Sequence, residues 1–192
     1  MKGLGVSPGI GIGKAFLIDK KSMIIEKIYV NDTEMEISKF RNAMEMGKNQ
    51  LNELYTKTLE EVGEKEAQIF KSHEMMLEDD TFTSEVEIRI KNEKINADYA
   101  LNETSSTYIK LFENIEDEYL RERAEDIKDV MTRVIKILLG INTTDYSCFE
   151  KNSIIIAKDL TPSDTAQIDK SRVSAMITET GGKTSHAAII AR

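Results

Sequence analysis

The sequence has few of the residues that break or crosslink a chain: one cysteine, two prolines, ten glycines and no tryptophan among 192 residues. The single thiol, Cys148, excludes an internal disulfide framework and is typical of a reducing compartment, so we interpret it as an inert thiol. No apolar run is long enough to predict a transmembrane helix, and no N-terminal pattern predicts a signal peptide. We therefore expect a cytoplasmic protein without membrane insertion.

Acidic residues outnumber basic ones, 34 to 26, and they are unevenly placed. Residues 31–142 hold 26 acidic and 15 basic residues, a net charge of −11, whereas the rest of the chain has a net charge of +3. An acidic middle argues against binding to nucleic acid. These charges either solvate helix faces or steer a basic protein partner toward this stretch.

The middle of the chain lacks proline and holds only Gly47, Gly63 and Gly140 between residues 31 and 142, so it is free to be helical. Apolar residues recur there at steps of three and four, which predicts amphipathic helices that pack against each other. Three such stripes are Ile37, Phe40, Met44, Leu51, Leu54 and Val62; Ala97, Leu101, Thr104, Tyr108, Leu111 and Ile115; and Leu120, Ala124, Ile127, Met131, Val134 and Leu138.

Capping residues bound these stretches. Asp32 or Thr33 can cap the first long helix, and Asn96 can cap a later one. Asp117 can cap the last helix, and Gly140 can close it.

The two ends of the chain show a different pattern, in which short β-branched runs alternate with glycine turns. We predict an all-α domain of two long helical hairpins, residues 33–142, inserted into an α/β domain made of residues 1–32 and 143–192. The predicted strands are residues 2–6, 14–18, 153–158 and 173–178.

A histidine follows the last predicted strand. After residues 173–178 the chain reads Gly-Gly-Lys-Thr-Ser-His at 181–186, and an apolar run then predicts a helix start. A helix N-terminus offers unpaired N–H groups and a positive dipole end, which suit phosphate. There His186 could attack phosphorus and carry a phosphoryl group.

Two nucleotide-binding interpretations fail on single residues. A P-loop needs glycine five positions before Gly182, where the chain has Ile177. The glycines at 9, 11 and 13 do not form a dinucleotide fingerprint, because Lys14 stands where the third glycine should be.

The 181–192 segment, with its final Ala-Arg, resembles the phosphohistidine motif of phosphoenolpyruvate-utilising enzymes. Together with three other parts of the chain, it is similar to the enzyme I family of the bacterial sugar phosphotransferase system, from about residue 3 to the last residue. Those parts are residues 6–15, a middle part formed by 69–79 and 119–130, and 159–166.

The resemblance implies a phosphohistidine (swivelling) α/β domain that is incomplete here, with an inserted helical domain. It implies that His186 takes a phosphoryl group from phosphoenolpyruvate and passes it to the phosphocarrier protein HPr, and that the Thr165 hydroxyl hydrogen-bonds this histidine. From the residues alone, Thr165 is an ordinary short-helix residue. The expected phosphate-binding residues are Gly182, Lys183, Thr184, Ser185 and Arg192.

The resemblance also implies that HPr docks on the helical domain. Methionines and aromatic residues in this pattern are more often core, but exposed methionines also suit an adaptable surface. His73 has no second metal ligand four residues on, where Leu77 stands, so we interpret it as structural. The expected contact residues are Gln68, Met75, Met76, Phe82, Leu120 and Arg123.

In the family, phosphoenolpyruvate and Mg²⁺ are bound by a C-terminal domain, which also mediates dimerisation. We expect no cofactor or metal in these 192 residues and no reaction with phosphoenolpyruvate alone. One alternative is the swivelling domain of a phosphoenolpyruvate synthase or pyruvate phosphate dikinase. Another is a helical binding module without turnover.

Overall fold

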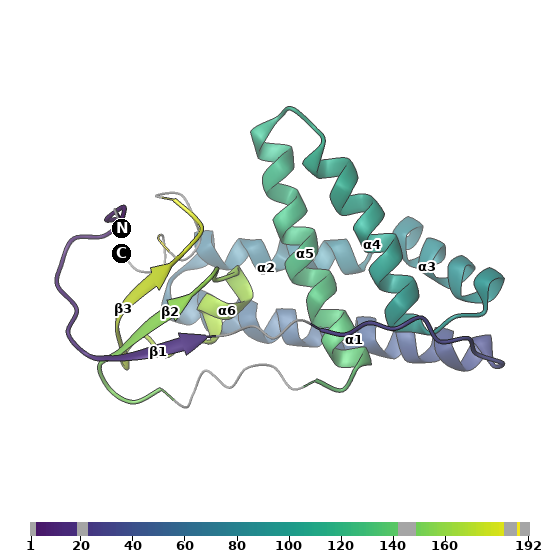
Figure 1. Ribbon diagram of the computed structural model, residues 1–192, viewed down its shortest axis with the longest axis horizontal. Helices are drawn as coiled ribbons and strands as arrows, with labels where there is room; N and C mark the ends of the chain where they lie inside the picture. Colours follow the sequence, from purple (N-terminus) through teal and green to yellow (C-terminus); the bar gives the residue numbers. More distant parts are fainter. Residues whose placement is uncertain (1–2, 19–22, 142–148, 183–187, 189–192) are drawn as a thin grey trace. The chain divides into compact units, whose positions relative to one another are not determined.

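The computed structural model describes residues 3–18, 23–141, 149–182 and 188. Over these residues the chain is mostly helical, with one small parallel sheet (Figure 1). The chain divides into two compact units. One takes Met1–Ser22 and Thr144–Arg192 from the two ends, and the other is Met23–Thr143.

The helical unit confirms the helical character predicted for the middle of the chain. Helix α1 packs along α2, and α4 packs along α5, with α3 against α4 and α1. The pairing of α4 with α5 is visible in Figure 1. The helices are α1 (Thr33–Glu61), α2 (Glu64–Leu77), α3 (Asp80–Glu93), α4 (Ala97–Glu113) and α5 (Glu118–Leu138).

The predicted caps lie at the helix ends. The Asp32 carboxylate accepts a hydrogen bond of 2.9 Å from the Met35 amide at the start of α1, and Asp117 accepts one of 3.2 Å from the Leu120 amide at the start of α5. Gly140 follows α5 with φ +62°, a left-handed conformation that favours glycine. Local sequence therefore determines where these helices begin and end.

The apolar stripes form the core of the helical unit. On α1, each residue of the predicted stripe up to Leu54 is buried, and Gly47 and Thr58 continue the same face. A Cβ on Gly47 would lie 3.3 Å from the side chains of Leu77 on α2 and Val134 on α5. The small residue therefore lets three helices approach closely at this point. The α4 stripe ends sooner than predicted, because Leu111 is 61% exposed.

Residues 23–32 belong to the helical unit, although the sequence placed them in the α/β domain. Asn96 precedes α4 as predicted, but its side chain makes no cap bond there. Its amide oxygen accepts from the Ile28 amide, and its amide nitrogen donates to the Glu26 carbonyl, each at 2.9 Å. Tyr29 also pairs with Ile95 in an antiparallel bridge. These long-range bonds, which have no local sequence signal, attach the segment to the helices.

The other unit is built on a three-stranded parallel sheet in the order β1-β2-β3. Lys14 pairs with Ser153 and Ile18 with Ala157, so the two ends of the chain meet in one sheet. The prediction of a further strand at 2–6 is wrong for residues 3–6, which lie outside any strand. The strands are β1 (Lys14–Ile18), β2 (Ser153–Ala157) and β3 (Val173–Thr178).

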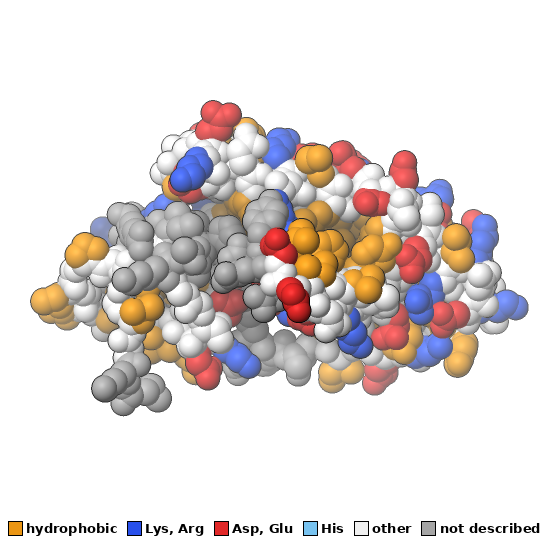
Figure 2. Space-filling model, turned by 90° about the horizontal axis from the view of Figure 1, so that it is seen from above, with side chains coloured by type: hydrophobic (Ala, Val, Ile, Leu, Met, Phe, Trp, Pro, Cys, Tyr) orange, Lys and Arg blue, Asp and Glu red, His pale blue; other side chains and the backbone are white. Residues whose placement is uncertain are grey.

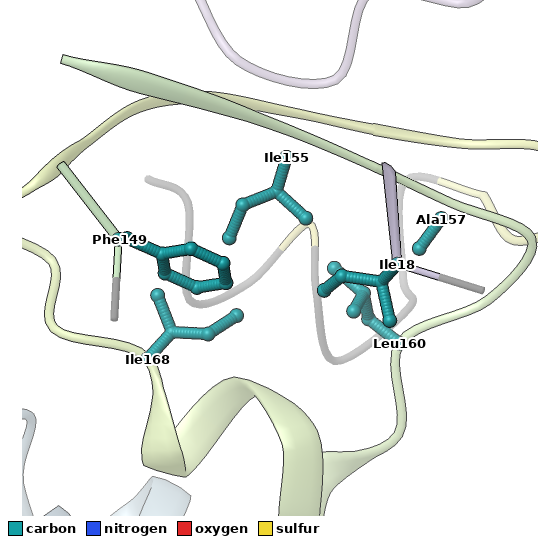
Figure 3. Packing of buried hydrophobic residues seen from close by; sticks show 6 residues of the cluster. All are labelled: Ile18, Phe149, Ile155, Ala157, Leu160 and Ile168. Atoms are coloured by element: carbon teal, nitrogen blue, oxygen red, sulfur yellow. The ribbon is translucent and has the colours of Figure 1, made fainter. Parts of the chain in front are cut away.

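The core of this unit lies on one face of the sheet. Figure 3 shows Ile155 of β2 and Ile18 of β1 pointing toward Ile168, just after the short helix α6 (Pro162–Gln167). Phe149 is also buried and packs edge to face on Phe16 with ring centroids 4.9 Å apart. This face therefore holds α6 against the sheet.

We predict that Gly13→Ala disrupts the sheet unit but not the helical unit. A Cβ at this position would lie 1.6 Å from the backbone oxygen of Asn152, which also accepts the Lys14 amide at 3.1 Å. Backbone cannot yield as a flexible side chain does, so β1 must shift away from β2. In a two-dimensional amide NMR spectrum, the resonances of β1–β3 should move or broaden while those of α1–α5 stay in place.

Gly5→Ala is the matched control, because nothing lies within 4 Å of the place that its added methyl group would occupy, and Gly5 lacks a positive φ. Its spectrum should match the wild type. Unshifted strand resonances in Gly13→Ala would contradict the prediction.

Candidate functional site

The loop after β3 carries the glycine pair that precedes the predicted phosphoacceptor. Gly181 has φ +106°, which only glycine adopts readily, and Gly182 has open space around it. The proposed site residues Lys183, Thr184, Ser185, His186 and Arg192 lie outside the described residues. Ala188, which is described, is helical and only 3% exposed.

The loop after β2 lies at the same edge of the sheet, because β2 and β3 are parallel. Hydrogen bonds join the two loops. The Thr180 amide and hydroxyl donate to the Lys158 carbonyl at 3.0 and 3.1 Å, and the Glu179 amide donates to the Ala157 carbonyl at 3.1 Å. The glycine pair and the segment leading into α6 are therefore held together at the carboxyl edge of the sheet.

Helix α6 begins with a reciprocal capping box. The Asp164 amide donates to the Thr161 hydroxyl oxygen at 3.2 Å, and the Asp164 carboxylate accepts the Thr161 amide at 2.9 Å. Pro162 occupies the first turn, where a missing N–H costs nothing. The Thr-x-x-Asp spacing is a sequence signal for this cap, although Thr161 is not among the caps predicted above.

Thr165 is fully buried one turn into α6. Its hydroxyl lies 2.9 Å from the Pro162 carbonyl and 3.1 Å from the Thr161 carbonyl and donates to them. A hydroxyl has one proton but two lone pairs. Because the proton is directed into the helix, the Thr165 oxygen is left able to accept a hydrogen bond from a donor outside α6.

The six predicted partner-binding residues come from three helices and differ in exposure. On α2, Gln68 is exposed, Met75 is 70% exposed and Met76 is half-buried. On α5, Leu120 and Arg123 are half-buried. Since α2 packs against α5, these five residues can contribute to one surface. Figure 2 shows hydrophobic side chains gathered among interspersed acidic and basic ones on one face of the molecule.

Phe82, the sixth predicted contact residue, is buried, with only 6% of its surface exposed. Its ring packs edge to face on Tyr108 with centroids 5.4 Å apart. The Tyr108 hydroxyl donates to Glu85 at 2.9 Å, and this bond, helped by burial, raises the pKa of Tyr108. Phe82 thus anchors α3 to α4, and it can support a partner surface only from beneath.

Metal and membrane signals are not found in the described part of the chain. Residues 3–18, 23–141, 149–182 and 188 contain no group of three histidine, cysteine or acidic side chains placed to hold a metal ion. Within the same ranges, no helix is long and apolar enough to cross a membrane.

Comparison with family models gives two matches. Residues 2–123 match the model described as PEP-utilising enzyme, N-terminal, and residues 149–192 match PEP-utilising enzyme, mobile domain. The first match alone covers more than half of the chain.

Curated relatives match along the whole chain. It is 42% identical to the phosphoenolpyruvate-protein phosphotransferase of Listeria monocytogenes and 41% identical to that of Bacillus subtilis, each over 192 residues. Both alignments cover 100% of this chain but 34% of the relative. The chain therefore spans about a third of the length of these relatives.

Solved structures support the fold. A solution NMR structure of Enzyme I (nEIt) is 42% identical, with a TM-score of 0.82, and the alignment covers 97% of this chain and 76% of that one. The N-terminal domain of Enzyme 1 - Nitrogen has a TM-score of 0.69 at 20% identity, covering 96% and 76% of the two chains, so it supports the fold alone.

We predict that Thr161→Ala loosens α6 and with it Thr165. Loss of an N-cap side chain costs about 1 kcal/mol, which is about a fivefold change in an equilibrium constant. The Thr165 amide, which donates to the Thr161 carbonyl at 3.0 Å, should exchange with solvent deuterium about fivefold faster. Thr161→Ser keeps the hydroxyl and should exchange like the wild type. Equal exchange in Thr161→Ala and wild type would show that the capping box does not hold the helix.

Proposed function

The chain belongs to the PEP-utilising enzyme family, and we propose that it is the N-terminal part of a phosphoenolpyruvate-protein phosphotransferase of the sugar phosphotransferase system. In this proposal His186 accepts a phosphoryl group that originates from phosphoenolpyruvate and passes it to HPr. The names of the relatives support this function and do not support the synthase or dikinase alternative. The mobile-domain match over residues 149–192, which contains His186, is the observation that carries the proposal.

The proposed architecture is a swivelling phosphohistidine domain interrupted by an HPr-binding helical domain. The division of the chain into a sheet unit made from both ends and a helical unit between them supports it. We propose the domain bounds predicted from the sequence, except that residues 23–32 go with the helical domain. We further propose that Mg²⁺ and phosphoenolpyruvate bind, and dimerisation occurs, in a part of the relatives that this chain does not cover, and that the protein acts in the cytoplasm.

Thr165 supports the proposed chemistry through the direction of its hydrogen bonds. While its hydroxyl donates into α6, it can serve as an acceptor toward a histidine. A ring N–H that donates to it leaves the other ring nitrogen with a lone pair. Thr165 would thus select the tautomer of His186 that can act as a nucleophile.

The transfer itself is an exchange of one phosphorus bond for another. The lone pair of the His186 nitrogen forms a bond to phosphorus as the bond to the donor oxygen or nitrogen breaks, and the leaving group keeps that electron pair. We propose that Gly182 and the backbone and side chains of Lys183, Thr184, Ser185 and Arg192 bind the phosphoryl oxygens. Catalysis then consists mainly of positioning and charge stabilisation.

We predict that phospho-HPr, but not phosphoenolpyruvate with Mg²⁺, phosphorylates the 192-residue chain at His186. Phosphohistidine is stable in alkali, so intact-mass measurement at alkaline pH should show one added phosphoryl group after incubation with phospho-HPr. His186→Ala should show none. Labelling by phosphoenolpyruvate and Mg²⁺ alone would mean that the chain carries its own donor site, and no labelling from phospho-HPr would favour a binding module without turnover.

We predict that Met75→Asp weakens HPr binding at least about tenfold, because it places a charge in the most exposed apolar position of the proposed contact set. Isothermal titration calorimetry with unphosphorylated HPr measures this. Met46→Asp on α1 is the control, since Met46 is 53% exposed and outside the contact set, and it should bind like the wild type. Equal affinity of Met75→Asp and wild type would remove this surface from the proposal.

A further inference from the structure

His73 is a fully buried histidine between α2 and α5 that the proposed transfer does not use. Its ring packs edge to face on Phe70 with centroids 6.1 Å apart. Among the residues that the structure describes, neither ring nitrogen has a hydrogen-bond partner. Buried polar atoms are normally paired, because an unpaired one keeps the full cost of its desolvation. The residue therefore needs an explanation beyond filling space.

One carboxylate on α5 faces this ring. The Nε2 atom of His73 lies 3.5 Å from Oδ1 of Asp126, which is only 8% exposed. The other oxygen, Oδ2, accepts a hydrogen bond of 3.2 Å from Nη1 of Arg123. The carboxylate thus lies between an inner histidine and an outer arginine whose side chain is 30% exposed.

We propose that His73 is a positioning residue that, through Asp126, fixes the guanidinium of Arg123 on the partner-binding surface. This inference rests on the proposed function, in which Arg123 contacts HPr. An arginine side chain has many rotamers, and its ordering on binding weakens the affinity unless something fixes it beforehand. A guanidinium held in place meets carbonyl or carboxylate oxygens of the partner in one fixed geometry.

The surroundings explain why Asp126 needs the histidine. A nearly buried carboxylate is costly unless both oxygens have polar neighbours. With an apolar side chain at position 73, Oδ1 would lose the polar ring that faces it, and the carboxylate would turn toward solvent. The Arg123 guanidinium would then move with the Asp126 carboxylate or pair with another acidic side chain. Glu125, the next acid along α5, is already held by Lys128 at 2.7 Å.

The test compares two substitutions at position 73. His73→Leu fills the space without a polar atom, whereas His73→Gln places an amide N–H close to where Nε2 lies. In His73→Leu, HPr affinity measured by calorimetry should fall about three- to tenfold, and the Nε–Hε resonance of Arg123 should shift toward that of a mobile arginine. His73→Gln should restore both.

A double-mutant cycle separates positioning from a structural effect. On an Arg123→Gln background, His73→Leu should cost no further affinity, because the group that it positions is absent. An equal loss on both backgrounds, or a failure of His73→Gln to restore the Arg123 resonance, would overturn the proposal.

Two further measurements keep the test decisive. If His73→Leu lowers the melting temperature so far that the protein is unfolded, Asp126→Asn removes the same link with less change in packing, and it should shift the Arg123 resonance in the same direction. An unshifted resonance would overturn the proposal.

If the wild-type protein does not bind HPr, the proposed function fails. The Arg123 resonance still reports in that case whether His73 fixes the arginine side chain.

Discussion

The pairing of β1 with β2 is the constraint on which the sheet unit depends. It joins Lys14–Ile18 to Ser153–Ala157, two segments separated by the whole helical unit. The entropy cost of closing a loop rises slowly, by about 0.6 kcal/mol for each doubling of its length, so a long insertion is tolerated if it folds by itself. The helical unit meets that condition, because residues such as Phe40, Leu51 and Val134 are buried among its own helices.

Parallel strands also determine where chemistry can occur. A parallel sheet directs the loop after β2 and the loop after β3 to the same edge, and bonds from Thr180 to the Lys158 carbonyl hold the two loops together. This brings the segment leading into α6 and the glycine pair at 181–182, which are separate in sequence, to one edge of the sheet. The proposed site therefore depends on topology, in line with the general placement of sites at the carboxyl ends of parallel strands.

Local signals explain what the sequence could predict. Asp32 and Asp117 cap helices as predicted, and the apolar stripe of α1 matches its buried face, because both depend only on neighbours within a turn or two. Strand β3 has its predicted bounds, since its apolar run is limited on both sides by turn residues.

The predictions from sequence fail where a residue interacts with another that is distant in the sequence. Residues 3–6 have strand-like composition but lie outside any strand, because sheet membership needs a neighbour that composition cannot supply. Asn96 uses its amide on Ile28 and Glu26, and Phe82 is buried against Tyr108 across two helices. The bond from Arg123 to Asp126 could have been suspected from the spacing of three residues, but the approach of His73 from another helix could not.

The contact between α2 and α5 shows why such a distant polar contact matters. An all-apolar seam would be at least as stable, since burying a carboxylate costs more than burying a side chain of similar volume without charge. Asp126 is nevertheless buried at this seam, where its carboxylate faces His73 of α2 and accepts a hydrogen bond from Arg123 of its own helix. Sliding α5 along α2 would separate His73 on α2 from Asp126 on α5, whereas apolar side chains would tolerate the shift. The polar contact therefore favours one register of the two helices. The same register sets the spacing between Met75 on α2 and Arg123 on α5, so two side chains from different helices can act as parts of one surface.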